Sequence, residues 1–150
     1  MKVALSADHA GFALKEDMRD FLKQRGYDVI DLGTDRGDQP DDYPVFAQRI
    51  GESLLKGQAE RGLLICGSGV GASIAANKIK GIYAALCHDT YSAHQGVEHD
   101  DMNVLCLGSR VIGVELAHEI ALSFLKATFS NEERHVRRVG ETRAIEKAGH

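Results

Sequence analysis

Short, almost continuously apolar segments alternate along the chain with segments whose apolar residues recur every three to four positions. The apolar segments lie at 2–7, 27–33, 63–66, 82–86 and 103–107. Unbroken apolar runs of this length are typical of strands that are buried on both faces of a parallel sheet. The alternation predicts five successive strand–helix units. We therefore expect an α/β, three-layer Rossmann-like fold, in which a five-stranded parallel sheet carries helices on both faces.

The intervening segments show the period of an amphipathic helix. They predict helices over 12–25, 45–57, 72–79, 91–98 and 114–127, followed by a charged helical tail from residue 131 onward. In the first of these helices, Leu14, Met18 and Leu22 fall on one face, and Gly26 marks its end. No repeat, linker or low-complexity segment interrupts the pattern, so residues 1–150 are expected to form a single domain.

Composition narrows the class of protein. The chain is 43% hydrophobic and 27% charged, and its formal net charge is −4, which disfavours a nucleic-acid-binding protein. No apolar run approaches the ~18 residues that a membrane helix needs, so we expect no membrane association and a cytoplasmic location. Three cysteines, Cys66, Cys87 and Cys106, form no C-x-x-C pair. This spacing favours free thiols in a reducing compartment over disulfides or a zinc site.

The ends of the predicted strands carry most of the reactive side chains. Ligands of open parallel sheets bind beyond the carboxyl ends of the strands. The residues that follow the five strands are Asp8-His9, Gly33-Thr34, Cys66 to Gly71, Cys87-His88-Asp89 and Gly108-Ser109-Arg110. The sequence therefore predicts a ligand site along this edge.

A glycine-rich turn, Gly67-Ser68-Gly69-Val70-Gly71, joins the third strand to the next helix. Glycines let consecutive backbone N–H groups converge on an anion at the start of a helix. One candidate is a dinucleotide pyrophosphate, because Gly67-x-Gly69-x-x-Ala72 fits the loose G-x-G-x-x-G/A fingerprint and Asp89 lies near the ribose-binding position. The other is a small oxyanion that forms during a reaction.

Cys66 stands at the start of this turn. A thiolate beside backbone donors can remove a proton from carbon next to a carbonyl, and the donors then hold the resulting oxyanion. The alternative is that Cys66 is simply a small buried apolar residue. In the same way, Asp8 and His9 after the first strand can exchange protons with a sugar hydroxyl or contact a phosphate, or Asp8 can merely cap a turn.

Two further clusters attract attention. The segment 88–101 is rich in histidine and acidic residues, but it offers no defined set of metal ligands. His94 and His99 are five residues apart and do not share a helical face, whereas His94 and Glu98, four apart, could share one. A single acid–base histidine is favoured there, with His99 as the candidate. In the tail, Arg134 and Arg138 would lie one turn apart on a helix and could bind a phosphate, or could form part of a solvated charged face.

Six segments in the same order resemble ribose-5-phosphate isomerase of the B type, a family that also contains galactose-6-phosphate and allose-6-phosphate isomerases. They are DHAGFALK (8–15), DYP (42–44), ICGSGVGASIAANK (65–78), GIYAALCHDTYSA (81–93), NVLCLGSRVIG (103–113) and RHVRRV (134–139). The resemblance covers nearly the whole chain. It implies an aldose–ketose isomerase without metal or organic cofactor, and a homodimer, sometimes paired into a tetramer, whose active sites are shared between subunits.

The resemblance also implies a role for individual residues. Cys66 resembles the family's catalytic base, with the Ser68 hydroxyl close to the reacting oxygens. His99 resembles the acid–base that opens the sugar ring, helped by Asp8. The remaining residues would bind substrate. Gly67, Gly69, Val70 and Gly71 would form the anion hole. His9, Arg134, Arg138 and Arg110 would bind the phosphate, and Tyr43 and Asp100 would contact the sugar.

Two positions separate this chain from parts of the family. One branch of the family has a glutamate base where this chain has Ala72, so the chain resembles the cysteine branch. The family usually reads His-Asn-Asp where this chain has His99-Asp100-Asp101, and a carboxylate accepts hydrogen bonds where an amide also donates them. We expect interconversion of D-ribose 5-phosphate and D-ribulose 5-phosphate. The alternatives are an isomerase for another four- to six-carbon sugar phosphate and a nucleotide-binding regulatory module.

Overall fold

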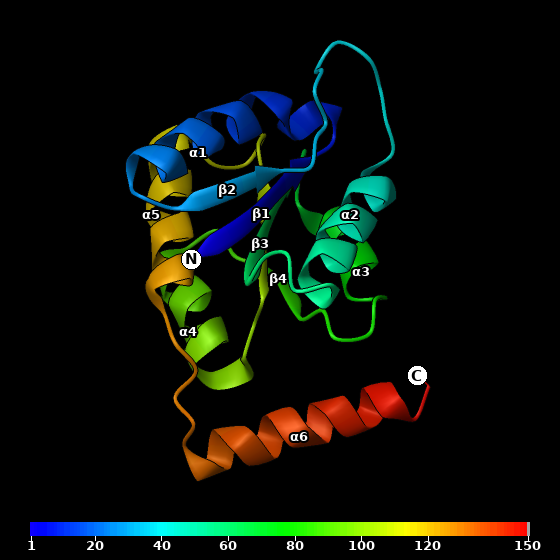
Figure 1. The fold of residues 1–150 in the computed structure, drawn as a ribbon, viewed down its shortest axis with the longest axis vertical. Helices are drawn as coiled ribbons and strands as arrows, with labels where there is room; N and C mark the ends of the chain where they lie inside the picture. The colour runs from blue at the N-terminus through cyan, green and yellow to red at the C-terminus, as the bar shows by residue number, and fades with distance from the viewer. Residues whose placement is uncertain (150) are drawn as a thin grey trace.

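The computed structural model describes residues 1–149 and contains one five-stranded parallel sheet with the strand order β2-β1-β3-β5-β4 (Figure 1). The strands are β1 (Lys2–Ala7), β2 (Asp28–Asp31), β3 (Arg61–Cys66), β4 (Ala84–Leu86) and β5 (Val104–Gly108). All five predicted strands are present, and the α/β Rossmann-like architecture is confirmed. The central strands β1, β3 and β5 are buried almost throughout, as their unbroken apolar runs indicate.

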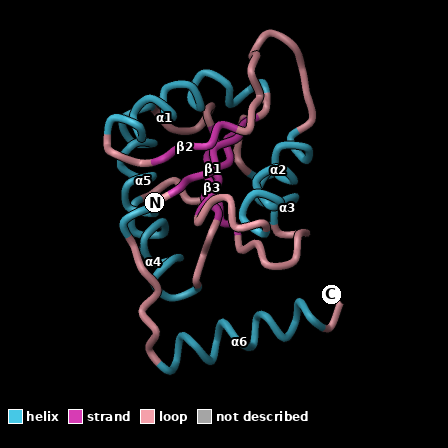
Figure 2. The backbone as a smooth tube through the Cα atoms, viewed as in Figure 1, coloured by secondary structure: helices cyan, strands magenta, loops and turns pink. Residues whose placement is uncertain are grey.

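Helices cover both faces of the sheet (Figure 2). They are α1 (Phe12–Gln24), α2 (Tyr43–Leu55), α3 (Val70–Ala76), α4 (Thr90–Asp100), α5 (Val114–Lys126) and α6 (Glu133–Lys147), with a short 3-10 turn η1 (His9–Gly11) before α1. Apolar side chains of α1, α4 and α5 form one core against the sheet. Those of α2 and α3 form a second core on the opposite face, so the sheet is the middle of three layers.

Several element boundaries differ from the predicted ones for physical reasons. β3 begins at Arg61, two residues early, because its guanidinium donates hydrogen bonds to the carbonyl oxygens of Phe124 and Ala127 at the end of α5. The helix expected at 72–79 lies at Val70–Ala76 instead. Asn77 ends it there, since the Asn77 side chain exchanges two 2.8 Å hydrogen bonds with the backbone of Ala84 in β4.

Two topological features position the site. The chain leaves β1 outward to β2 and then crosses back to β3, so the carboxyl ends of β1 and β3 flank a switch point, where ligands of such sheets bind. Helix α6 confirms the predicted helical tail and lies outside the three layers, next to the end of α4 (Figure 1). No helix within residues 1–149 is long and apolar enough to cross a membrane.

Candidate active site

Asp8 follows β1 directly and caps the turn η1. Its carboxylate accepts a hydrogen bond from the N–H of Gly11 at 3.1 Å, so the capping interpretation is confirmed. The side chain is 6% exposed, and burial raises the pKa of Asp8 above its ordinary value, although the Gly11 N–H and His9 oppose the shift. A carboxyl group that protonates more readily than usual is suited to acid–base work.

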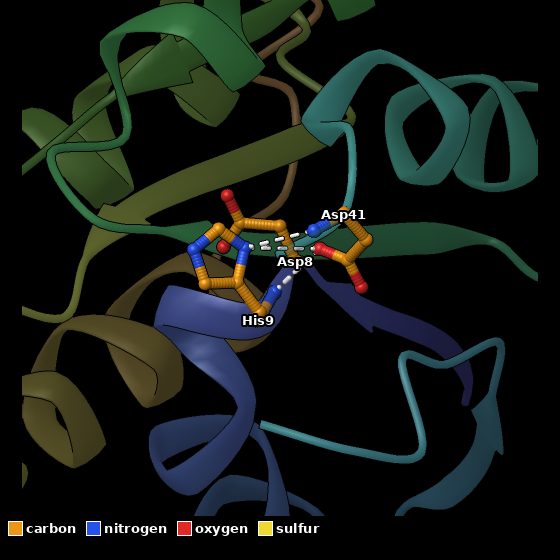
Figure 3. Close-up of side chains that lie close together, drawn as sticks. All are labelled: Asp8, His9 and Asp41. Atoms are coloured by element: carbon orange, nitrogen blue, oxygen red, sulfur yellow. Dashed lines mark hydrogen bonds and ion pairs between the residues drawn. The ribbon is translucent and has the colours of Figure 1, made fainter. Parts of the chain in front are cut away.

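His9 is held by a residue that the sequence did not single out. Asp41, in the loop before α2, accepts the backbone N–H of His9 at 2.7 Å, and the same Oδ1 lies 3.2 Å from His9 Nδ1 (Figure 3). The backbone N–H of Asp41 also lies 3.2 Å from Nδ1. Four aspartates occupy residues 35–42, and nothing in the sequence indicates which of them returns to His9.

Asp8, His9 and Asp41 place one potential metal-ligand atom each within 4.8 Å of one another. Atoms of all three side chains already take part in hydrogen bonds of the chain itself, from the backbone N–H groups of Gly11, His9 and Asp41. One polar atom of each side chain is therefore already engaged by a backbone N–H group.

Cys66 ends β3, and its sulfur meets the glycine turn. The side chain is 5% exposed and contacts the core formed by α2 and α3, while Sγ accepts a hydrogen bond from the N–H of Gly69 at 3.1 Å. Gly69 has φ of +82°, and a Cβ there would lie 3.0 Å from the carbonyl carbon of Leu107. Only glycine fits this conformation and this space without strain. Cys66 is thus both packed and placed against backbone donors.

The other two thiols lack this setting. Cys87 and Cys106 are buried in the interior, and burial raises the pKa of Cys87 to about 11 and that of Cys106 further still. Such thiols remain protonated and unreactive at neutral pH. The expected free state of all three cysteines is confirmed.

Three more predicted residues surround the turn. The Ser68 hydroxyl accepts the N–H of Val70 at 3.2 Å. The ring of Tyr43, the first residue of α2, packs so closely on Gly71 that an added Cβ would lie 2.7 Å from it. The Arg110 guanidinium lies over Gly67, 3.2 Å from where a Cβ would be. One edge of the sheet therefore carries Asp8, His9, Tyr43, Cys66, the turn 67–71 and Arg110.

The remaining predicted site residues lie at the opposite edge. Helix α4 runs from the carboxyl end of β4 back to the amino end of β5, so His99 and Asp100 at its end lie near the amino ends of the strands. Arg134 and Arg138 lie nearby on α6, where Asp100 and Arg138 line a cavity of about 310 Å³. Within the described part of one chain, this second group does not meet Cys66.

His99 is held from two sides. The side-chain amide nitrogen of Gln95, one turn earlier, lies 3.0 Å from His99 Nδ1, and the ring stacks on that of His135 at 4.0 Å. Burial, together with the facing His99 ring, lowers the pKa of His135. As their spacing predicted, His94 and Glu98 share a face of α4, with Nδ1 3.0 Å from Oε1.

Asp89 bears on the dinucleotide interpretation of the turn. Its side chain caps α4 by accepting the N–H of Ser92 at 2.6 Å. A carboxylate in this role is already engaged by the backbone. The structure thus gives Asp89 a capping role at the start of α4.

Comparisons with known proteins identify the family of the chain. Residues 3–142 match the family profile described as Ribose/Galactose Isomerase. The ribose-5-phosphate isomerase B of Escherichia coli is 44% identical over 146 residues, 97% of each chain. The D-erythrulose-4-phosphate isomerase of Pectobacterium atrosepticum is 39% identical over 150 residues, 100% of this chain and 94% of that protein. The structure of Clostridium thermocellum ribose-5-phosphate isomerase B has a TM-score of 0.95 and 47% identity, with 99% of both chains covered.

The fold and the sequence place the chain among the sugar-phosphate isomerases. The chain belongs to the Ribose/Galactose Isomerase family, as the resemblance of its motifs predicted. Family membership removes the basis for a nucleotide-binding regulatory module.

Proposed function

We propose that the protein interconverts D-ribose 5-phosphate and D-ribulose 5-phosphate through a cis-enediolate. The observation that carries the proposal is the position of Cys66 at the switch point between β1 and β3, with Sγ 3.1 Å from an N–H of the glycine turn. A thiolate here would take the proton from C2 of the open-chain aldose. The C–H electron pair would form the C1–C2 double bond, and the carbonyl pair would move to O1. The Cys66 thiol, whose proton can exchange with solvent, would then protonate C1, while the O2–H proton passes to O1 and the C2 carbonyl forms.

Backbone donors stabilise the charge that appears in this step. The N–H of Gly69 donates to Cys66 Sγ, and we propose that amides of the turn 67–71 hold the oxyanion. Preorganised donors of this kind are worth about 3–4 kcal/mol each when removed from other oxyanion sites. Asp8, whose pKa is raised by burial, would take part with His99 in opening the sugar ring. In this scheme proton transfer needs no metal or organic cofactor.

We further propose that two copies of the chain complete each site. His99, Arg134 and Arg138 lie at the opposite edge of the sheet from Cys66, so one chain cannot place them on the substrate bound at the turn. A second copy with twofold symmetry can present this edge to the first and receive the same contact in return. Arg134 and Arg138 of the second copy would then bind the phosphate together with His9, and with Arg110 beside the turn.

Mixing two inactive variants tests this arrangement. Cys66→Ala and His99→Ala are each expected to lose turnover of D-ribose 5-phosphate. If sites are shared, random reassembly gives half heterodimers, each with one intact site, so activity returns to about a quarter of the wild-type value. Reassembly that yields heterodimers without activity would contradict shared sites. Titration of the two variants at several ratios distinguishes this from incomplete exchange.

A second candidate substrate is a tetrose phosphate. The 39% identical relative is a D-erythrulose-4-phosphate isomerase, and Asp100 stands where the family usually has asparagine. Comparison of kcat/KM for ribose 5-phosphate, allose 6-phosphate, galactose 6-phosphate and erythrulose 4-phosphate decides between the candidates. The proposal requires ribose 5-phosphate to have the highest value, and a tetrose phosphate at least tenfold better would replace it.

A further inference from the structure

Asp41 contacts both the backbone and the imidazole ring of His9. Its Oδ1 accepts the backbone N–H of His9 at 2.7 Å, which fixes the start of η1 (Figure 3). The same oxygen lies 3.2 Å from Nδ1 of the His9 ring, and so does the backbone N–H of Asp41. Main chain and imidazole are therefore both held by one residue that lies 32 positions away in the sequence.

The two contacts at Nδ1 have complementary hydrogen-bonding roles. When the ring is neutral, Nδ1 can accept the N–H of Asp41, and the ring proton then resides on Nε2. When the ring is protonated, Nδ1–H can donate to the Asp41 carboxylate, and Nε2 again carries a proton. In these two states Nε2–H remains free to donate to an anion, because Asp41 occupies only the other nitrogen. A neutral ring with its proton on Nδ1 would leave Nε2 bare, and the Asp41 N–H that donates to Nδ1 disfavours this tautomer.

The position of the pair allows it to act on a bound substrate. The His9 and Asp41 side chains are 31% and 25% exposed, so the ring is accessible while it is held. Asp8, the preceding residue, is buried, and its carboxylate lies within 4.8 Å of the polar side-chain atoms of the pair. An imidazole that is oriented in advance loses less freedom when it binds a phosphate than one that rotates freely.

We propose that Asp41 is a positioning residue, which holds the His9 imidazole with Nε2–H directed at the phosphate of the substrate. This rests on the proposed function, in which His9 binds phosphate. The Asp41 carboxylate hydrogen-bonds to His9 and takes no part in proton transfer. Its contribution is to substrate affinity, so it appears in KM and in the dissociation constant of phosphate before it appears in kcat.

The direction in which Asp41→Ala changes phosphate affinity distinguishes a positioning role from a purely electrostatic one. Asp41→Ala removes a negative charge near an anion site, and charge alone would strengthen phosphate binding. Loss of positioning weakens it instead. We expect Asp41→Ala to raise the Kd of inorganic phosphate, measured by calorimetry, about tenfold, the value of one charge-assisted hydrogen bond. Asp41→Asn keeps an oxygen acceptor, so we expect a smaller rise of about threefold.

A matched control lies in the same loop. Asp38 is exposed and, within residues 1–149, forms its ion pair with Arg36, so Asp38→Ala removes the same charge without touching His9. This variant is expected to bind phosphate like the wild type. With ribose 5-phosphate as substrate, Asp41→Ala should raise KM about tenfold and change kcat less than threefold.

Several results would overturn the inference. Phosphate affinity in Asp41→Ala that equals or exceeds that of Asp38→Ala would show that charge, not positioning, dominates. Equal loss in kcat and kcat/KM would show that Asp41 acts on the chemistry. Nitrogen-15 spectra of the His9 ring give a further readout without substrate, and an Nε2 that carries no proton in the wild type would also contradict it. If ribose 5-phosphate is not turned over by the wild type, the proposed function fails, while the phosphate and nitrogen-15 measurements still decide the role of Asp41.

Discussion

Replacement of Gly69 by alanine measures how tightly the glycine turn is built. Gly69 has φ of +82°, and a Cβ there would lie 2.5 Å from Leu86 Cδ1 and 3.0 and 3.1 Å from the carbonyl carbon and oxygen of Leu107. The Leu86 methyl group can rotate away. The Leu107 carbonyl cannot, because β5 is paired on both sides within the sheet. The turn itself must therefore move.

Two separable costs add up in this variant. A non-glycine residue in the left-handed region costs about 1–2 kcal/mol, and overpacking against a rigid neighbour adds about 1–3 kcal/mol. The free energy of unfolding should thus fall by about 2–5 kcal/mol. Gly26→Ala is the matched control, since Gly26 has φ of +88° and open space around a Cβ. In Gly26→Ala the free energy of unfolding should fall only by the backbone cost, about 1–2 kcal/mol.

Urea denaturation of both variants at one pH gives the two values by linear extrapolation. The difference between Gly69→Ala and Gly26→Ala isolates the packing of the turn, because the backbone conformation and the gain of a methyl group are common to both. Since the N–H of Gly69 donates to Cys66 Sγ, turnover should fall in Gly69→Ala and persist in Gly26→Ala. Equal destabilisation of the two variants would refute the packing argument.

Further predictions concern stability, pH, thiol reactivity and metal removal. Asp31 lies 2.8 Å from the ammonium group of Lys15, whose side chain is 1% exposed, and Asp31→Ala leaves this buried charge without its main partner. The free energy of unfolding, measured by urea denaturation, should fall by about 3 kcal/mol. It should fall by less than about 1 kcal/mol in the exposed control Asp38→Ala. The pKa of His135 is lowered in the folded protein, so below the ordinary value of 6.5 His135 binds a proton more readily in the unfolded chain than in the folded one. The free energy of unfolding should therefore drop from pH 7 to pH 5.5. The drop should be smaller in His135→Phe. Iodoacetamide at pH 7.5 should label Cys66 and spare Cys87, whose pKa is raised to about 11, and peptide mass analysis that finds Cys87 labelled first would contradict this. Dialysis against EDTA should leave kcat unchanged, and loss of activity that Mg²⁺ or Zn²⁺ restores would argue for a metal in the mechanism.

Local patterns predicted the elements of this fold better than their arrangement. Near-continuous apolar runs located the central strands β1, β3 and β5, because burial on both faces leaves little choice of side chain. The edge strands β2 and β4 are only partly buried and were located from shorter apolar segments. Arg61 was missed as a strand residue, since its charge is satisfied by carbonyl groups of α5 that only the tertiary structure supplies. The placement of β5 between β3 and β4 also has no local signal, because it depends on which crossover buries the helices best.

Some residues of the candidate site could also be placed from the sequence, and others could not. Residues that directly follow strands, such as Asp8 and Cys66, could be placed from the sequence, because parallel strands all end at one edge. His99 lies eleven residues after His88 and reaches the opposite edge only because α4 runs back along the sheet. Asp41 was missed because its partner His9 is 32 residues away, in a loop whose aspartates look alike.

The transfer of a proton by Cys66 is the claim on which the account depends most. Its direct test is isomerisation of ribose 5-phosphate in D₂O by the wild type and by Cys66→Ala, with deuterium at C1 of the ketose and C2 of the aldose followed by NMR. The account predicts turnover and exchange that both fall by about 10³-fold or more in Cys66→Ala, within the range for loss of a general base, while inorganic phosphate binds as in the wild type. Exchange at the wild-type rate in Cys66→Ala would contradict it and assign the proton to another group.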